Sequence, residues 1–346
     1  MQNSVLPVIS AIIPMYNGGE KIRVCLQKLD QQDIQEPYEV LIVDDASPDG
    51  SADKTEEHIR GLSHPERFRL IRCAENGRAG QARNIGVREA TGEYIVFLDQ
   101  DDYPDTGMLK VLYELTENGK FDCTVCDIVD KNGGEYHRYP CGRKETLTPE
   151  DRKQAMTQFG YVFAILIRKK IIEENRLHFP EKVMFEDSLY NHGLLSCIDS
   201  IYTAEKALYY RDDDENSQTA SLSVKKLRDR VKATEIYLDN FQKSTKIIHY
   251  MPIINQYAFY YIYLSCILWM IRDEALYDKE LYTHCYRKGH ELGIKWDEVY
   301  LSQRHFGEKN LKLLKAIYYV PRIGTFLRIK TKTRNALGRI KHRVAG

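Results

Sequence analysis

The feature that most constrains the fold is a regular alternation, over the first hundred residues, of short apolar runs with segments of helical periodicity. The apolar runs, which predict strands, occupy residues 8–13, 38–43, 68–73 and 94–98. Between them, apolar side chains recur three or four residues apart, as at Ile22, Leu26 and Leu29, which predicts helices. Strands that are apolar on both faces and joined by helices form parallel sheets. The pattern therefore predicts an α/β fold with a Rossmann-like, mostly parallel sheet flanked by helices.

After residue 105 the pattern becomes mixed and then helical. We expect a helix through Leu109, Leu112 and Leu115 and a strand over residues 121–129. A polar loop or hairpin over 130–149, helices over 169–176 and 188–196, and a strand over 200–210 complete this part. From about residue 223 helical periodicity predominates, so we expect a helical C-terminal extension.

The most apolar stretch of the chain, residues 253–271, is nearly long enough to span a bilayer. It also contains Asn255, Gln256 and four tyrosines, which are unfavourable inside a membrane. We therefore expect a buried helix here, with membrane insertion as the alternative.

Charge is distributed unevenly, although the totals of 50 basic and 50 acidic residues cancel. Residues 309–346 contain 11 Lys and Arg and no Asp or Glu, which leaves 39 basic against 50 acidic residues in the preceding 308. This tail alternates cations with Ile, Leu, Phe and Tyr, a pattern typical of helices that bind anionic membrane surfaces. A soluble basic terminus is the alternative, and the lack of a recognition module argues against nucleic acid as a partner.

The eight cysteines are scattered, and the first residues lack the basic and apolar regions of a signal peptide. We expect free thiols in a reducing cytoplasm, with peripheral contact at the inner face of the membrane through the basic tail. Cys123 and Cys126 have the spacing of a zinc or redox pair, but no second pair completes a site. Because they lie in an apolar, β-branched run, we interpret both as strand residues.

Acidic residues follow two of the predicted strands, and ligands bind beyond the carboxyl ends of strands in such sheets. Asp99, Asp101 and Asp102 place three carboxylates within four positions. They repel one another unless a cation is present, so the run predicts a Mg²⁺ or Mn²⁺ site with positions left for diphosphate oxygens. Asp44 and Asp45 follow the second strand, where a carboxylate can accept the N3–H of a uracil or bind a ribose hydroxyl. A solvated acidic turn and a helix-entry Asp are the structural alternatives.

Four polar segments occur in a fixed order within residues 5–220: 10–17 (SAIIPMYN), 43–51 (VDDASPDGS), 76–86 (NGRAGQARNIG) and 97–102 (FLDQDD). A later acidic segment is Phe185-Glu186-Asp187. Together they resemble the motif set of family 2 glycosyltransferases with the GT-A fold, and the acidic segment resembles that family's acceptor-side motif. The resemblance implies inverting transfer of a hexose or N-acetylhexosamine from a nucleotide sugar, most often a UDP-sugar.

The same resemblance implies a role for each matching residue. Nucleotide-sugar binding falls to Pro14, Tyr16, Asp45, Arg83, Asp99 and Gln100. Within this set Tyr16 stacks on the base and Asp45 holds the uracil edge. Asp101 binds the Mn²⁺ or Mg²⁺ ion, and whether Asp102 shares it stays open.

The general base implied by the resemblance is Asp187, with Glu186 as its rival, because adjacent side chains point in different directions. Without the upstream motifs, compensation of a helix dipole would be the preferred interpretation of both acids. Tyr209-Tyr210-Arg211, at the end of the last predicted strand, either brings a cation to the diphosphate or is an ordinary strand end.

We expect a GT-A domain over residues 1–222, with a nucleotide-binding half (1–102) and an acceptor half (103–222). A helical region over 223–346, including the basic tail, follows it. The expected partners are a nucleotide sugar, a glycan or lipid-linked acceptor of cell-envelope or capsular polysaccharide assembly, and an anionic membrane surface. The alternatives are a nucleotidyltransferase, although its glycine- and lysine-rich loop is missing, and a membrane-associated, non-catalytic protein on a transferase scaffold.

Overall fold

The computed structural model describes residues 6–130, 133–136, 142–156, 161–212 and 221–293, together with positions 312, 315, 316 and 319. The chain divides into two compact units. The first comprises Met1–Ser217 and Asp239–His249, and the second comprises Gln218–Leu238 and Tyr250–Gly346. Most of the basic tail, residues 309–346, lies outside the described residues, so its expected helix is not tested.

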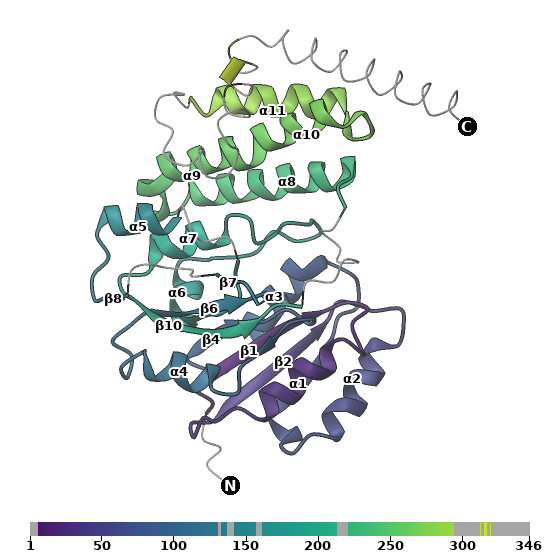
Figure 1. Cartoon of the computed structure of the whole chain (residues 1–346), viewed down its shortest axis with the longest axis vertical. Helices are drawn as coiled ribbons and strands as arrows, with labels where there is room; N and C mark the ends of the chain where they lie inside the picture. The colour runs from purple at the N-terminus through teal and green to yellow at the C-terminus, as the bar shows by residue number, and fades with distance from the viewer. Residues whose placement is uncertain are drawn as a thin grey trace. The chain divides into compact units, whose positions relative to one another are not determined.

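The first unit is built on a ten-stranded sheet of order β3-β2-β1-β4-β9-β6-β10-β5, with β7 beside β6 and β8 beside β10 (Figure 1). The strands are β1 (Ile9–Met15), β2 (Tyr38–Asp44), β3 (Phe68–Arg72), β4 (Tyr94–Phe97), β5 (Tyr103–Pro104), β6 (Cys123–Val129), β7 (Glu135–Tyr136), β8 (Arg143–Lys144), β9 (Ile165–Arg168) and β10 (Ile201–Tyr210). The first four strands of this order are parallel, as are β6 and β10, whereas β9 is antiparallel to both of its neighbours. The predicted α/β fold is confirmed, and the sequence pattern does not predict β9.

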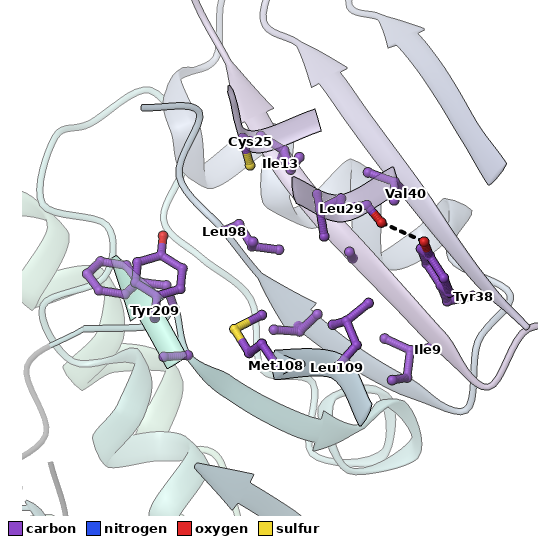
Figure 2. Close-up of a cluster of buried hydrophobic side chains, with 14 of the residues drawn as sticks. Ile9, Ile13, Cys25, Leu29, Tyr38, Val40, Leu98, Met108, Leu109 and Tyr209 are labelled. Carbon is purple, nitrogen blue, oxygen red and sulfur yellow. Dashed lines mark hydrogen bonds between the residues drawn. The ribbon is translucent and has the colours of Figure 1, made fainter. Parts of the chain in front are cut away.

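Helices cover both faces of this sheet. In the first unit they are α1 (Ile22–Asp30), α2 (Ser51–Arg60), α3 (Arg78–Glu89), α4 (Met108–Glu114), α5 (Pro149–Met156), α6 (Lys169–Glu174) and α7 (Tyr190–Cys197), with 3₁₀ turns at Pro65–Arg67 and Ile247–Tyr250. Successive side chains of a strand point to opposite faces. Ile9 and Ile13 of β1 join side chains of α1 and α4 in one apolar core (Figure 2). On the other face Ile12 packs so closely on α3 that a Cβ on Gly86 would lie 2.3 Å from its Cγ2.

The apolar core also carries polar contacts that fix α1 on the sheet. Tyr38 donates through its hydroxyl to the backbone carbonyl of Leu29 at 2.5 Å, which ties β2 to α1 (Figure 2). Strand register places Met15 opposite Asp44 and Ile12 opposite Phe97, so the carboxyl ends of β1, β2 and β4 lie at one edge. This edge holds the acidic runs predicted from the sequence.

The second unit is helical. It includes most of α8 (Val224–Phe241), then α9 (Met251–Tyr257), a π-helix (Ala258–Leu264), α10 (Ser265–Arg272), a 3₁₀ turn (Glu274–Leu276) and α11 (Lys279–Glu291). The apolar stretch 253–271 therefore forms a helix whose middle is π-helical, and Ile254, Phe259 and Ile262 in it are fully buried. No helix among the residues that the structure describes combines the length and apolar character needed to cross a membrane.

The interpretation of Cys123 and Cys126 as strand residues is confirmed. Both thiols are buried in β6, and burial raises the pKa of the Cys123 thiol well above its usual range. The described part of the chain contains no group of three or more His, Cys, Asp or Glu side chains preformed around a metal position.

Candidate functional site

The candidate site lies at the carboxyl ends of β1, β2 and β4, where the backbone is locally strained. Asn17 follows β1 with a φ of 51°, Ala46 follows β2 with a φ of 56°, and Phe185 has a φ of 64°. Non-glycine residues rarely adopt positive φ, and such strain concentrates at functional sites. The strained positions coincide with three of the sequence motifs.

The Asp99–Asp102 turn is held through contacts with distant parts of the chain. Asp99 Oδ1 accepts a hydrogen bond from Arg83 Nη2 at 2.8 Å. The Gln100 side-chain amide pairs with the Tyr16 backbone, accepting from its N–H at 2.9 Å and donating to its carbonyl at 3.2 Å. A Cβ on Gly18 would lie 2.1 Å from Gln100 Oε1, so this loop passes directly over the amide. Gln100 therefore positions the loop that carries Tyr16.

The last carboxylate of the turn, that of Asp102, is also held by hydrogen bonds. Asp102 is 5% exposed, and its two oxygens accept hydrogen bonds from the Tyr209 hydroxyl at 2.8 Å and the Asp212 backbone N–H at 3.0 Å. Burial, reinforced by the charges of Asp99 and Asp101, raises the pKa of Asp102.

Asp101 differs from its neighbours because its carboxylate makes no hydrogen bond to another residue in the described part of the chain. Burial, and then the charge of Asp99, raise the pKa of Asp101. A half-buried carboxylate with a repulsive neighbour and open oxygens is suited to bind a cation.

The carboxylates that follow β2 also have separate surroundings. Asp45 is 2% exposed, and its oxygens accept from the backbone N–H groups of Gly77 at 2.7 Å and Arg78 at 2.8 Å, where α3 begins. Burial raises the pKa of Asp45, and these two hydrogen bonds oppose that rise. Asp44 Oδ2 accepts a long bond of 3.3 Å from the Ser47 N–H. Its Oδ1 is buried without a hydrogen-bond partner among the residues described.

Arg83, on α3, connects the acidic turn to the later acidic segment. It is 4% exposed, and its guanidinium binds Asp99 through Nη2 and Glu186 Oε1 through Nη1. The Phe179 ring lies below the guanidinium, 5.4 Å from Cζ to the ring centroid. One buried cation thus joins carboxylates that are 87 positions apart in the sequence.

Asp187 lies beside this pair. Burial first, and then the neighbouring charge of Glu186, raise the pKa of Asp187 to about 7, against the opposing effect of Arg83. A carboxylate with a pKa near neutrality suits general base catalysis. Glu186 is held by Arg83, which gives the two adjacent acids different chemistry.

Sequence reasoning did not identify the contribution of Tyr209. Its hydroxyl contacts Asp102 across 107 positions, and a strand-end tyrosine carries no sequence signal for such a contact. The segment 180–182 was missed in the same way. Lys182 N–H donates to the Gly77 carbonyl at 2.8 Å, and a Cβ on Gly80 would lie 2.1 Å from the Pro180 carbonyl oxygen.

Residues 10–176 match the family model described as Glycosyl transferase family 2. The glycosyltransferase EpsJ of Bacillus subtilis, itself described as uncharacterized, is 30% identical over 224 residues, which cover 62% of this chain and 64% of EpsJ. The chain therefore spans just under two thirds of the length of that relative.

Solved structures share the fold. A crystal structure of residues 1–349 of S. aureus TarS in complex with UDP-GlcNAc has a TM-score of 0.69 at 19% identity, covering 91% of this chain and 92% of that one. The mannosyltransferase PcManGT of Pyrobaculum calidifontis, in complex with GDP-Man and Mn²⁺, has a TM-score of 0.51 at 16% identity, covering 95% and 88%. TarS is also named a poly(ribitol-phosphate) beta-N-acetylglucosaminyltransferase, and its sequence is 25% identical over 223 residues, 62% of this chain and 37% of TarS.

Proposed function

Because residues 10–176 match the model of glycosyl transferase family 2, we propose that the chain transfers a sugar from a nucleotide diphosphate, preferentially UDP, to an acceptor hydroxyl with inversion at the anomeric carbon. The observation that carries the proposal is the network centred on Arg83, which joins the donor-side Asp99 to the Glu186-Asp187 segment. Inversion requires groups on opposite sides of the transferred sugar. A carboxylate set for the leaving group and a separate base for the nucleophile meet that requirement.

Asp187 is the proposed general base. As the acceptor oxygen forms its bond to the anomeric carbon, the bond from that carbon to the diphosphate oxygen breaks and the nucleoside diphosphate leaves, while the hydroxyl proton passes to the Asp187 carboxylate. Its raised pKa makes it a better proton acceptor than an ordinary aspartate at neutral pH. The Glu186 carboxylate is engaged in the ion pair with Arg83, so the proposal assigns the base to Asp187.

The donor nucleotide is proposed to bind at the ends of β1 and β2. Tyr16, held by Gln100, stacks on the base beside Pro14. Asp45 holds the uracil edge in this proposal, and it also fixes the start of α3 through Gly77 and Arg78. In this proposal Arg83 lies near the nucleotide, and Asp99 lies near the ribose and diphosphate.

The residues present fit a divalent cation, Mn²⁺ or Mg²⁺, at Asp101. Its open carboxylate faces the unfavourable charge of Asp99, which a cation would relieve. Mg²⁺ and related ions are commonly held by one or two carboxylates together with substrate phosphates, so a cage of three protein ligands is not required. When bound, such an ion supplies charge neutralisation for the departing nucleoside diphosphate. Asp102, with both oxygens already engaged, is proposed to position the turn rather than to bind the ion.

The proposed acceptor is a hydroxyl on a glycan, a glycopolymer or a lipid-linked saccharide of cell-envelope or capsular assembly. The name of TarS, which specifies poly(ribitol-phosphate) and N-acetylglucosamine, supports a cell-envelope polymer and an N-acetylhexosamine or hexose as the transferred group. The basic tail would bring the protein to the membrane surface where such acceptors are assembled.

Nucleoside diphosphate release tests the function. We expect UDP release from one member of a panel of UDP-sugars, dependent on Mn²⁺ or Mg²⁺ and accelerated by a suitable acceptor. A preliminary thermal-shift screen identifies the donor, because ligands that bind only the folded state raise its melting temperature. Release of pyrophosphate from a nucleoside triphosphate and a sugar 1-phosphate, with no nucleoside diphosphate released from any nucleotide sugar, would instead indicate a nucleotidyltransferase. Donor binding without any release would favour a non-catalytic scaffold.

A further inference from the structure

We propose that Tyr209 is a positioning residue of the donor site, whose hydroxyl holds the Asp99–Asp102 turn in the conformation that presents Asp101 to the cation and diphosphate. The inference rests on the proposed function. It assigns a role to the strand-end tyrosine that the catalytic scheme leaves unused.

The first observation is a closed set of hydrogen bonds through a single oxygen. The backbone N–H of Asp99 donates to the Tyr209 hydroxyl at 3.1 Å, and that hydroxyl donates to Asp102 Oδ2 at 2.8 Å. The turn closes on itself where the Asp102 N–H donates to the Asp99 carbonyl at 3.2 Å. Tyr209 thus joins the first and last residues of the turn, and Asp101 lies between them.

The second observation is that the hydroxyl is well suited to this double role. Tyr209 is fully buried, and its hydroxyl both accepts from the Asp99 N–H and donates to Asp102 Oδ2. Asp102 needs this donor because its carboxylate is almost completely removed from water. Its second oxygen is satisfied by the Asp212 N–H, so both ends of this contact are anchored to the end of β10.

The third observation concerns the rigidity of the tyrosine itself. Its ring stacks on Phe163 with centroids 4.6 Å apart and planes 12° from parallel. Tyr209 also pairs with Pro104 in the β10–β5 ladder, directly after the turn. Figure 2 shows it among the buried side chains of the sheet core, which include Leu98, the residue just before the turn. Packing therefore fixes where the hydroxyl lies, as expected of a group that orients metal-binding residues.

These contacts leave each residue of the turn with a different restraint. Arg83 restrains Asp99, Tyr16 restrains Gln100, and Tyr209 restrains Asp102. The Asp101 carboxylate, which has no such partner in the described chain, is the group left to bind a ligand. Without the Tyr209 hydroxyl, the turn loses contacts at both ends, and the repulsion between Asp99 and Asp101 can open it.

The test is the affinity for Mn²⁺ in the presence of saturating UDP, followed by electron paramagnetic resonance of free Mn²⁺. Tyr209→Phe removes only the hydroxyl and keeps the ring stack. We expect Mn²⁺ affinity to fall about 10- to 100-fold, the range found when groups that orient metal ligands are removed. Metal-independent UDP binding, measured by calorimetry, should change by less than about twofold because the base site is untouched. Tyr202→Phe is the matched control. Tyr202 lies on the same strand as Tyr209, and its hydroxyl makes no hydrogen bond to the residues that the structure describes. The Tyr202→Phe protein should therefore bind Mn²⁺ as the parent does.

A second variant, Asp102→Asn, leaves Tyr209 intact and alters the same contact from its other end, so by itself it should weaken Mn²⁺ binding about 10- to 100-fold even where Tyr209→Phe folds poorly. Asp102→Asn keeps an oxygen for the Asp212 N–H but puts an amide donor where the hydroxyl now donates. If Tyr209 acts through Asp102, the double variant should bind Mn²⁺ about as weakly as either single variant. Losses that multiply in the double variant would instead make Asp102 a ligand in its own right and overturn the inference.

The outcomes separate the inference from the function on which it rests. If the parent protein binds no Mn²⁺ in the presence of UDP, the proposed metal-assisted function fails. If the parent binds Mn²⁺ and Tyr209→Phe binds it equally well, the function stands and the positioning role is wrong. A lower melting temperature with unchanged Mn²⁺ affinity would reduce Tyr209 to a structural residue.

Discussion

Two adjacent carboxylates, Glu186 and Asp187, have different surroundings, because in the described part of the chain the buried Arg83 guanidinium forms a hydrogen bond with Glu186 and none with Asp187. We predict that Asp187→Asn lowers kcat by about 10²- to 10⁴-fold, the usual contribution of a general base. Glu186→Gln should cost less, because its amide oxygen can still accept from Arg83. Sugar transfer measured at saturating donor and acceptor checks both, and an Asp187→Asn enzyme with near-normal kcat would remove the assignment.

The pH dependence of activity follows from the same pair. A general base works when it is deprotonated, and burial raises the pKa of Asp187 to about 7, so kcat/KM should rise with pH through this region and level off above it. Because the Glu186 charge is one cause of the raised pKa, Glu186→Gln should move the midpoint to lower pH. A pH profile of both proteins gives the direction, and an upward shift in the variant would contradict the stated cause.

Asp101 is the residue on which the metal proposal depends. We predict that Asp101→Asn lowers metal-dependent UDP release on the order of 100-fold, because the neutral amide holds a divalent ion poorly. The loss should be smaller at high Mn²⁺ concentration. Asp33→Asn is a suitable control, because that carboxylate is exposed and paired with Lys110 at 3.1 Å outside the site. Full Mn²⁺-dependent activity in Asp101→Asn would place the ion elsewhere.

The residues of the candidate site could be predicted from the sequence. The residues with which they form hydrogen bonds could not. Acidic residues after apolar runs marked the strand ends, since strand type and sheet edge follow from local periodicity. The pairing of Asp102 with Tyr209, or of Asp45 with the start of α3, depends on the approach of segments far apart in the sequence. No local pattern encodes these contacts. The site assignments themselves stay predictions until the variants are measured.

Among the elements, those with strong periodicity were predictable and those defined by their neighbours were not. β1, β2, β3 and β4 lie within two residues of the predicted ranges, because each is an apolar run ended by polar or turn residues. β9 has four residues and leads directly into α6, and β5 has two residues. Both strands are too short to show a hydrophobic periodicity of their own. β9 forms because the edge of β4 and the edge of β6 both need a hydrogen-bonding partner.

The contact of α3 with segment 180–182 gives an element-level prediction. Gly80→Ala would place a Cβ 2.1 Å from the Pro180 carbonyl oxygen, so the helix and the segment must separate. Overpacking of this kind costs about 1–3 kcal/mol. We therefore expect a lower melting temperature together with a reduced kcat, because the segment leads to Glu186 and Asp187. Gly61→Ala is the control, since its Cβ would meet only ordinary contacts of 3.5 Å or more, and it should change neither quantity.

If Gly80→Ala lowers stability but leaves kcat unchanged, the segment does not orient the acidic pair. Unchanged stability would mean that the backbone at Pro180 shifts freely, in which case the close packing of α3 has no role in the site.

At the level of the whole chain, the two compact units are not simple halves of the sequence. α8 contributes to both, since Gln218–Leu238 belongs to the second unit and Asp239–His249 to the first. The pattern changes near residue 222 from mixed to helical, but periodicity does not reveal that the chain returns to the first unit. That residues 1–222 form a domain that folds on its own stays a prediction.

The basic tail gives a prediction at the same scale. We expect the full chain to float with anionic liposomes and a chain ending at Glu308 to float much less, because the removed residues carry 11 cations and no acids. Raising the salt concentration should release the full chain, since screening weakens attraction between exposed charges. Equal flotation of both chains would mean that the tail does not bind membranes.

The bridge that Arg83 makes between Asp99 and Glu186 limits how this chain can be recombined with a relative. In a chimaera that joins the first 102 residues of one parent to the remainder of another, Arg83 and Asp99 come from the first parent. Glu186 comes from the second parent. A mismatch in side-chain length at position 186 would leave the buried guanidinium of Arg83 without one of its two carboxylate partners. New acceptor specificities are therefore better sought by exchanging the segment after β6, residues 130–149, than by swapping complete halves.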